Sequence, residues 1–167
     1  MPASRAKTQL FGRNPLSDSR SLAELHPRVR IMAEQLLEQA KHAGIPLTVT
    51  FTRRSMETQA ALYAQGRTAP GRIVTRARPG YSYHNFGMAI DVVPTELLAL
   101  PRWGDAPAHQ ARTDDLWNTV GAIGKAIGFR WGGDFSRLKD RPHFEWSGGL
   151  TLAQLRAGAQ ERDRMLL

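Results

Sequence analysis

The chain has 167 residues, the size of one ordinary domain, and is long enough to bury a hydrophobic core without a disulfide or a structural metal. Hydrophobic residues make up 41% and charged residues 23%, which excludes a disordered protein and is typical of a globular one. There is no cysteine, which excludes thiolate metal sites, a cysteine nucleophile and a disulfide framework. Any bound metal must therefore use His, Asp or Glu.

The formal net charge of +8 allows two interpretations: binding to nucleic acid, or association with another polyanion such as a bacterial envelope. The basic residues are scattered along the chain, and the only dense group is Arg72, Arg76 and Arg78 with Arg67 nearby. Scattered charge is usually a solvated surface, so we expect no specific nucleic-acid partner.

The N-terminal segment, residues 1–20, is expected to be polar and irregular. Residues 1–7 are followed by no apolar run long enough for a signal peptide, and no stretch approaches the roughly 20 apolar residues that span a bilayer. The sequence therefore predicts a protein made in the cytoplasm without a signal peptide and without a transmembrane segment.

Three elements are predicted in the first half of the chain. A helix begins with Pro27 at its first position, capped from His26, and ends at Gly44. A strand follows at residues 47–52, where β-branched residues alternate with others. Ser55 can cap a second helix that runs through Ala64 and is closed by Gly66. The apolar residues of the first helix recur at helical spacing: Val29, Met32, Leu36, Leu37 and Ala40.

The second half is expected to begin with a loop at residues 67–83, rich in Pro and Gly. A strand at residues 86–93 then places Met88, Ile90 and Val92 on one face and Ala89, Asp91 and Val93 on the other. After a loop at 94–112, Thr113 caps a helix with Asp114 and Asp115 in its first turn, and Gly128 ends it. Short strands at 129–131 and 142–146 and a last helix from Thr151 complete the chain.

Helices grouped around a small, mainly antiparallel sheet predict an α+β fold. No repeat, low-complexity tract or composition break marks a linker, so residues 1–167 are interpreted as a single domain.

Two segments carry candidate chemistry, residues 82–92 and residues 140–146. Zinc in a hydrolase takes three nitrogen or oxygen ligands and keeps a fourth position open, and without cysteine two His and one carboxylate are the commonest set. His84 and Asp91 are seven residues apart, about 23 Å in an extended strand, so the chain must turn back between them. Asn85-Phe86-Gly87 can form that turn.

Asp91 stands on an otherwise apolar strand. A buried carboxylate with no partner costs several kcal/mol, so a metal or a charged partner is expected beside it. His84 and Asp91 alone are weak evidence, because one such pair arises by chance in many chains of this composition.

The pattern Ser-x-His-x-x-Gly-x-Ala-x-Asp at residues 82–91, followed by Asp-x-x-His-Phe-Glu at 140–145, resembles the M15 family of zinc peptidases. It is most similar to the L-alanyl-D-glutamate peptidase branch found among bacteriophage endolysins. The resemblance spans most of the chain and includes further segments in the same order, at residues 54–55, 59–68, 128–134 and 148–151.

This resemblance implies a metallopeptidase with one zinc ion per chain, held by His84, Asp91 and His143. Asp140 is implied to be the general base and acid. Arg54 is implied to stabilise charge on the attacked carbonyl or to bind a substrate carboxylate. Arg53 is the alternative to Arg54, because alternation would point the two to opposite faces, and Asp140 could instead be a surface residue of the charged run 137–141.

Supporting roles are implied for Ser82 and Glu145. Each histidine ligand needs an acceptor for its second ring nitrogen, and Glu145 or Asp134 could supply one. D,D-dipeptidase relatives carry Glu where this chain has Asp140, which favours the endolysin branch. His26, His42 and His109 are expected at the surface, and the four tryptophans, including Trp103, in the core or at its rim.

The implied substrate is the peptide stem of peptidoglycan, cut between L-Ala and D-Glu. Two alternatives remain: a carboxypeptidase of the same family that removes terminal D-Ala, and a non-catalytic basic module that binds envelope or nucleic acid. As an endolysin the protein would act on the cell wall after release through holes made by another protein. We expect a monomer without a separate wall-binding domain, drawn to the anionic envelope by its charge.

Overall fold

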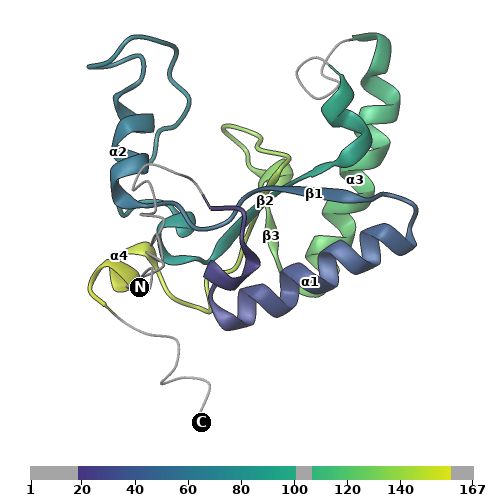
Figure 1. Ribbon diagram of the computed structural model, residues 1–167, viewed down its shortest axis with the longest axis horizontal. Helices are drawn as coiled ribbons and strands as arrows, with labels where there is room; N and C mark the ends of the chain where they lie inside the picture. Colours follow the sequence, from purple (N-terminus) through teal and green to yellow (C-terminus); the bar gives the residue numbers. More distant parts are fainter. Residues whose placement is uncertain (1–18, 101–106, 159–167) are drawn as a thin grey trace, which may run out of the picture.

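Two long helices pack against each other on one side of a small sheet, while a shorter helix stands at the other end of the molecule (Figure 1). The computed structural model describes residues 19–100 and 107–158. Within these ranges no helix is both long and apolar enough to cross a lipid bilayer. The expectations for the N-terminal segment up to residue 18 and for Trp103 lie outside the described residues.

Helix α1 (Pro27–His42) begins as predicted, with Pro27 in its first turn and His26 as its N-cap. The backbone N–H of Arg28 donates to His26 Nδ1 at 3.2 Å, which satisfies one of the free donors at the helix start. After the helix, Gly44 adopts a positive φ of 78°, a conformation that favours glycine.

The sheet has four strands in the order β1-β2-β4-β3, and every neighbouring pair is antiparallel. This confirms the predicted α+β class. The strands are β1 (Leu47–Phe51), β2 (Ala89–Pro94), β3 (Arg130–Trp131) and β4 (His143–Glu145). The two inner strands, β2 and β4, come from parts of the sequence about fifty residues apart.

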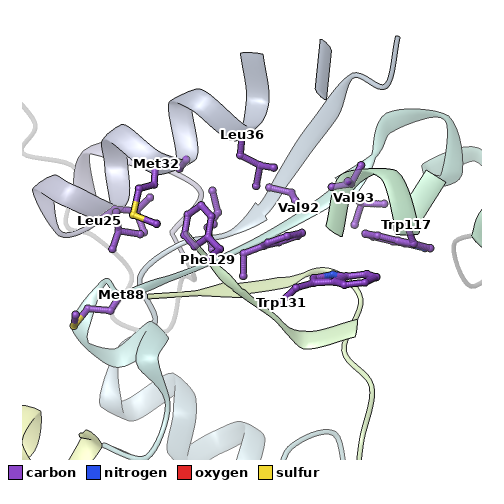
Figure 2. Close-up of a cluster of buried hydrophobic side chains, with 14 of the residues drawn as sticks. Leu25, Met32, Leu36, Met88, Val92, Val93, Trp117, Phe129 and Trp131 are labelled. Carbon is purple, nitrogen blue, oxygen red and sulfur yellow. The ribbon is translucent and has the colours of Figure 1, made fainter. Parts of the chain in front are cut away.

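The hydrophobic core lies between the sheet and the two long helices, α1 and α3 (Gln110–Ile127). Figure 2 shows Leu36 of α1 directed toward Val92 of β2, while Met32, one turn earlier on α1, lies beside Leu25. Phe144 of β4 is fully buried and packs against Phe129 and Trp131. Helix α3 approaches the sheet very closely, because a Cβ at Gly124 would overlap the ring of Phe144.

Helix α2 (Met56–Ala64) lies apart from the other two and is followed by a long loop, drawn in blue at the upper left of Figure 1. It is capped as predicted, with Thr58 N donating to Ser55 Oγ at 3.0 Å, and Gly66 follows with a φ of 70°. Helix α4 (Leu152–Arg156) begins after Thr151 in a complete capping box with Gln154.

Two predicted boundaries were wrong. Helix α3 begins at Gln110 rather than after Thr113, and Thr113 is fully buried within it. Its N-cap is His109, so Asp114 lies outside the first turn, where it accepts a hydrogen bond from the Gln110 side chain at 2.8 Å. A hydrogen bond between side chains four residues apart stabilises a helix, so this pair favours a helix that begins at Gln110. A search for a capping residue alone does not detect this effect.

The strand expected from residue 86 begins at Ala89. Residues 83–86 form a 3-10 turn, η2 (Tyr83–Phe86), and Gly87 closes it in the left-handed region with a φ of 68°. The loop expected at 94–112 contains two further 3-10 turns, η3 (Thr95–Ala99) and η5 (Pro107–His109). The remaining strands and α4 lie within two residues of their predicted bounds.

Candidate metal centre and active site

Three predicted ligands come together from three elements of the fold. Asp91 on β2 and His143 on β4 are paired directly across the sheet. His84 lies in η2, and the reversal at Gly87 brings its ring back over β2. A Cβ at Gly87 would come within 2.8 Å of the Glu24 carbonyl oxygen, so both the φ and the close approach require glycine here.

The three donor atoms form an almost equilateral triangle. His84 Nε2, His143 Nδ1 and Asp91 Oδ1 lie 3.1 Å from one another along all three edges. Zinc bonds of about 2.0–2.1 Å in tetrahedral geometry place neighbouring ligand atoms about 3.3 Å apart. The triangle therefore has the dimensions of one face of a zinc coordination tetrahedron, and the three residues form a group able to hold a metal ion.

The outer partners of the two imidazoles fix which ring nitrogens face inward as acceptors. His84 Nδ1 donates to the Thr52 carbonyl at 2.7 Å, and His143 Nε2 donates to Glu145 Oε2 at 2.8 Å. In the neutral rings, His84 Nε2 and His143 Nδ1 are then lone-pair donors to a metal. Two nitrogen lone pairs and a carboxylate oxygen converge on one point, so the residues fit a divalent cation.

The electrostatics of this group favour positive charge. Burial alone would raise the pKa of the Asp91 carboxyl, but the neighbouring His84 and His143 hold that pKa well below its usual range. Burial opposes a charged His143, yet hydrogen bonds to Asp91 and Glu145 outweigh it and raise the pKa of His143 to about 10. A divalent ion can replace this proton, so metal binding and proton release are coupled.

One predicted supporting residue is elsewhere. Both acceptor positions behind the histidines are occupied, one by the Thr52 carbonyl and the other by Glu145. Asp134 does not serve as an acceptor for either histidine; its carboxylate instead accepts from Lys125 Nζ at 2.9 Å, and both side chains are about half exposed. It sits at the end of η6 (Gly132–Asp134).

A cleft of about 360 Å³ opens over the three ligands. Its polar lining includes Arg54, Ser82 and Asp140, all predicted site residues. Its apolar lining comes from β1, α2 and the loop before β4, and comprises Phe51, Leu62 and Phe135. The loop that follows α2 forms a further wall with Val74, Thr75 and Ala77. The cleft is the place where a substrate can reach the metal centre.

Asp140 lies at the accessible rim of the cleft, three residues before His143. The surrounding protein removes part of its hydration, and this, with the negative charge of Asp91, raises the pKa of the Asp140 carboxyl. Its backbone carbonyl accepts from His143 N at 3.1 Å, which fixes the turn joining the two residues. Within the charged run 137–141, Asp140 therefore lines the cleft together with the three ligands.

Arg54 rather than Arg53 lines the cleft. Strand β1 ends at Phe51, so the choice follows from the bend after the strand and not from strand alternation. The backbone of Arg54 is held next to the metal centre, because its N–H donates to the His84 carbonyl at 3.0 Å. Its guanidinium lies over the ring of Phe51, with Cζ 5.1 Å from the ring centre.

Several supporting residues were missed by sequence reasoning. Gln59 is fully buried in α2 and bonds to Arg54, and Asn85 is buried in η2, where it accepts from Gly80 N and donates to the Arg54 carbonyl. Thr52 acts through its backbone carbonyl, which carries no sequence signal. Gln59 does lie within the segment 59–68 of the family resemblance, which was the one available pointer.

Comparison with known proteins identifies peptidases among the relatives of this chain. The sequence profile of the peptidase M15 family, described as D-alanyl-D-alanine carboxypeptidase, matches residues 75–146. The peptidoglycan L-alanyl-D-glutamate endopeptidase CwlK of Bacillus subtilis is 42% identical over 133 residues, which are 79% of each chain.

The L-alanyl-D-glutamate peptidase of Listeria phage A118 is 32% identical over 132 residues, which are 77% of this chain but only 41% of the phage protein. Among solved structures, the vancomycin-resistance D,D-pentapeptidase VanY in complex with Zn(II) shares the fold with a TM-score of 0.51 and 15% identity. That match covers 84% of this chain and 83% of VanY.

Proposed function

This chain belongs to the peptidase M15 family, and we propose that it is a zinc-dependent peptidoglycan hydrolase that cuts the L-alanyl-D-glutamate bond of the peptide stem. The observation that carries the proposal is the triangle of His84, Asp91 and His143 donors beneath a cleft that also presents Asp140 and Arg54. The bond assigned is the one named for the Bacillus subtilis and Listeria phage relatives.

In the proposed site, zinc would be held by His84 Nε2, Asp91 and His143 Nδ1. When bound it would supply a Lewis acid beside the scissile carbonyl and lower the pKa of water in the cleft. Glu145 and the Thr52 carbonyl keep the two imidazoles in the tautomers and orientations that metal binding needs.

Asp140 is proposed to handle the proton. As water attacks the amide carbonyl, the Asp140 carboxylate takes a proton from it and then returns that proton to the departing amine of D-Glu. A raised pKa suits both halves of this task, because a carboxyl with an ordinary pKa holds a proton too weakly at neutral pH. Asp140 therefore serves first as general base and then as general acid in one turnover.

Arg54 is proposed to face the negative charge of the substrate. Its guanidinium lines the cleft with the ligands, and the amide oxygen gains negative charge as water adds to the carbonyl. The same cation could bind the free carboxylate of D-Glu next to the scissile bond. Ser82, also in the lining, offers a hydroxyl for orienting the peptide.

The direct test is mass spectrometry of muropeptides after digestion with the purified protein. Loss of the L-Ala–D-Glu bond, abolished by a strong chelator and restored by zinc, is the expected result. His84→Ala should abolish the cleavage while the fold, followed by circular dichroism, persists. Cleavage that survives in His84→Ala would overturn the proposal.

A second candidate is removal of terminal D-Ala, which is favoured by the description of the profile that matches residues 75–146. The same digest separates the two, because a carboxypeptidase releases free alanine and leaves L-Ala–D-Glu intact. A non-catalytic basic module would instead contain no zinc on metal analysis, cut neither bond and show salt-sensitive binding to DNA.

We also propose that the protein acts as an endolysin, as a monomer, reaching the wall after release from the host cytoplasm. The phage relative supports this role. Expression in a bacterial host should cause lysis only when a membrane-permeabilising protein is expressed with it. Lysis without such a protein would contradict the release route, and light scattering on the purified protein tests the monomer.

A further inference from the structure

Gln59 is a polar side chain without any exposed surface, at the second turn of α2. A buried amide has to be hydrogen-bonded at both ends, since each unpaired group costs about 1–3 kcal/mol. Its Nε2 donates to the Ala77 carbonyl at 2.7 Å, and its Oε1 accepts from Arg54 Nη1 at 3.1 Å. The two ends of one amide thus bind two different parts of the cleft.

Both partners line the cleft, although they come from different segments. Arg54 follows β1, and Ala77 belongs to the wall formed by the loop after α2. Only a carboxamide matches this pair, because the guanidinium needs an acceptor and the carbonyl needs a donor. A carboxylate at position 59 could accept from Arg54 but could not donate to Ala77.

The backbone of Arg54 is fixed independently of Gln59. The Arg54 N–H donates to the His84 carbonyl at 3.0 Å, and the Arg54 carbonyl accepts from Asn85 Nδ2 at 3.1 Å. Gln59 adds a contact at the far end of the Arg54 side chain, on its guanidinium. With both ends held, the guanidinium is set in one orientation before a substrate arrives, which removes an ordering cost from binding and catalysis.

We propose that Gln59 is a positioning residue that sets the Arg54 guanidinium and the Ala77 wall of the cleft in a fixed relation to each other. The proposal rests on the proposed function, because it assigns Arg54 to the substrate. Among the described residues Gln59 is not part of the cleft lining, and its side-chain hydrogen bonds go to Arg54 and Ala77, so it acts through these two residues.

The test combines Gln59→Met with Arg54→Ala in a double-mutant cycle, measured as kcat/KM for cleavage of a purified stem peptide. Gln59→Met alone is expected to lower kcat/KM by about tenfold to a hundredfold, the cost of a misplaced charge. In the Arg54→Ala background the same substitution should change kcat/KM by less than about threefold, because the route through Arg54 is already lost and only the contact with Ala77 remains. Equal effects in both backgrounds would overturn the proposal.

Zinc affinity, measured by chelator competition, should remain unchanged in Gln59→Met, which separates positioning from damage to the metal centre. Gln35→Met, an exposed substitution of the same kind on α1, is the matched control and should match the wild type. If Gln59→Met does not fold, Gln59→Asn carries the same cycle, because it keeps an amide but is one methylene too short to reach both Arg54 and Ala77.

A second measurement does not depend on catalysis. In ¹⁵N NMR of the arginine side chains, rotation of the Arg54 guanidinium should be slow in the wild type and in Gln59→Glu, which can still accept from Arg54, and faster in Gln59→Met. Unchanged rotation in Gln59→Met would overturn the proposal even if the peptide is not a substrate. A wild type that cuts no stem peptide contradicts the proposed function, whereas an additive cycle in an active enzyme contradicts only the role of Gln59.

Discussion

Asp91 and His143 face each other across the β2–β4 pair, with Asp91 Oδ1 3.1 Å from His143 Nδ1. Their meeting is set by the register of the sheet, which also places Ile90 opposite Phe144 on the core side. A slip of one residue would turn one ligand toward the core, so the burial of Phe144 protects the metal centre.

The first prediction concerns the carboxylate ligand. Asp91→Asn keeps the size of the side chain but removes its charge, so zinc affinity should fall by at least about a hundredfold, beyond the loss typical of outer supporting groups. Chelator competition measures this directly. Asp115→Asn, on the solvent side of α3, is the control. If Asp91→Asn bound zinc as tightly as the wild type, Asp91 would not be a ligand.

The second prediction concerns pH and the metal-free protein. His143 has a pKa of about 10 in the fold against 6.5 in an unfolded chain, so its stabilising effect is complete below pH 6.5 and is lost as pH rises toward 10. The melting temperature of the chelator-treated protein should therefore fall across this range. His143→Gln should flatten the slope, and a wild-type melting temperature that rises instead would contradict the shift.

A third prediction compares how much Glu145, which bonds to His143, and Arg130, which bonds to Glu145, contribute to zinc affinity. Glu145→Gln removes the acceptor at 2.8 Å from His143 Nε2 and should weaken zinc binding by about tenfold to a hundredfold. Arg130 bonds to the other Glu145 oxygen, but its side chain is 69% exposed. Solvent screens such a pair, so Arg130→Met should change the affinity by less than about threefold. Titration of both variants with zinc checks the order of the two effects.

The close contact between α3 and the sheet gives a fourth prediction. Alanine has a higher helix propensity than glycine by about 1 kcal/mol, so Gly124→Ala would be stabilising in an exposed helix. Here the new methyl group would overlap Phe144, and overpacking of a core costs about 1–3 kcal/mol, so we expect net destabilisation. Urea unfolding measures it, with the exposed Ala126→Gly as the propensity control.

The fifth prediction concerns the net charge of +8. If the envelope attracts the enzyme electrostatically, the rate of lysis of whole cells should fall as salt shortens the Debye length from about 10 Å at 0.1 M to about 3 Å at 1 M. Cleavage of a small soluble stem peptide should change much less. A lytic rate that does not depend on salt would exclude this attraction.

Sequence reasoning was most successful where a local rule decides the structure. The caps at His26 and Ser55 and the start of the last helix at Thr151 follow from a few neighbouring residues, and the structure has all three. The ligand set was implied by the resemblance to the M15 family rather than by composition or spacing, and the structure brings its three donors together. For the helix starts, the physical cause lies within the neighbouring residues.

The errors arose where a distant part of the fold decides. Asp134 was a candidate acceptor for the second ring nitrogen of a histidine ligand, but the Thr52 carbonyl and Glu145 already occupy both acceptor positions. Gln59 gives no signal in a helix pattern, because its importance comes from partners five and eighteen residues away. Long-range contacts of this kind depend on tertiary packing rather than on local propensity.

The donors of the metal centre stand on the inner strands and on η2, whereas two walls of the cleft are loops, one after α2 and one before β4. Surface loops tolerate insertion and exchange far better than paired strands do. The metal ligands and most of the cleft wall can therefore evolve separately, although Asp140 itself lies in the loop before β4. Redesigning this peptidase for another bond should begin with the loop after α2 and leave β2, β4 and Asp140 unaltered.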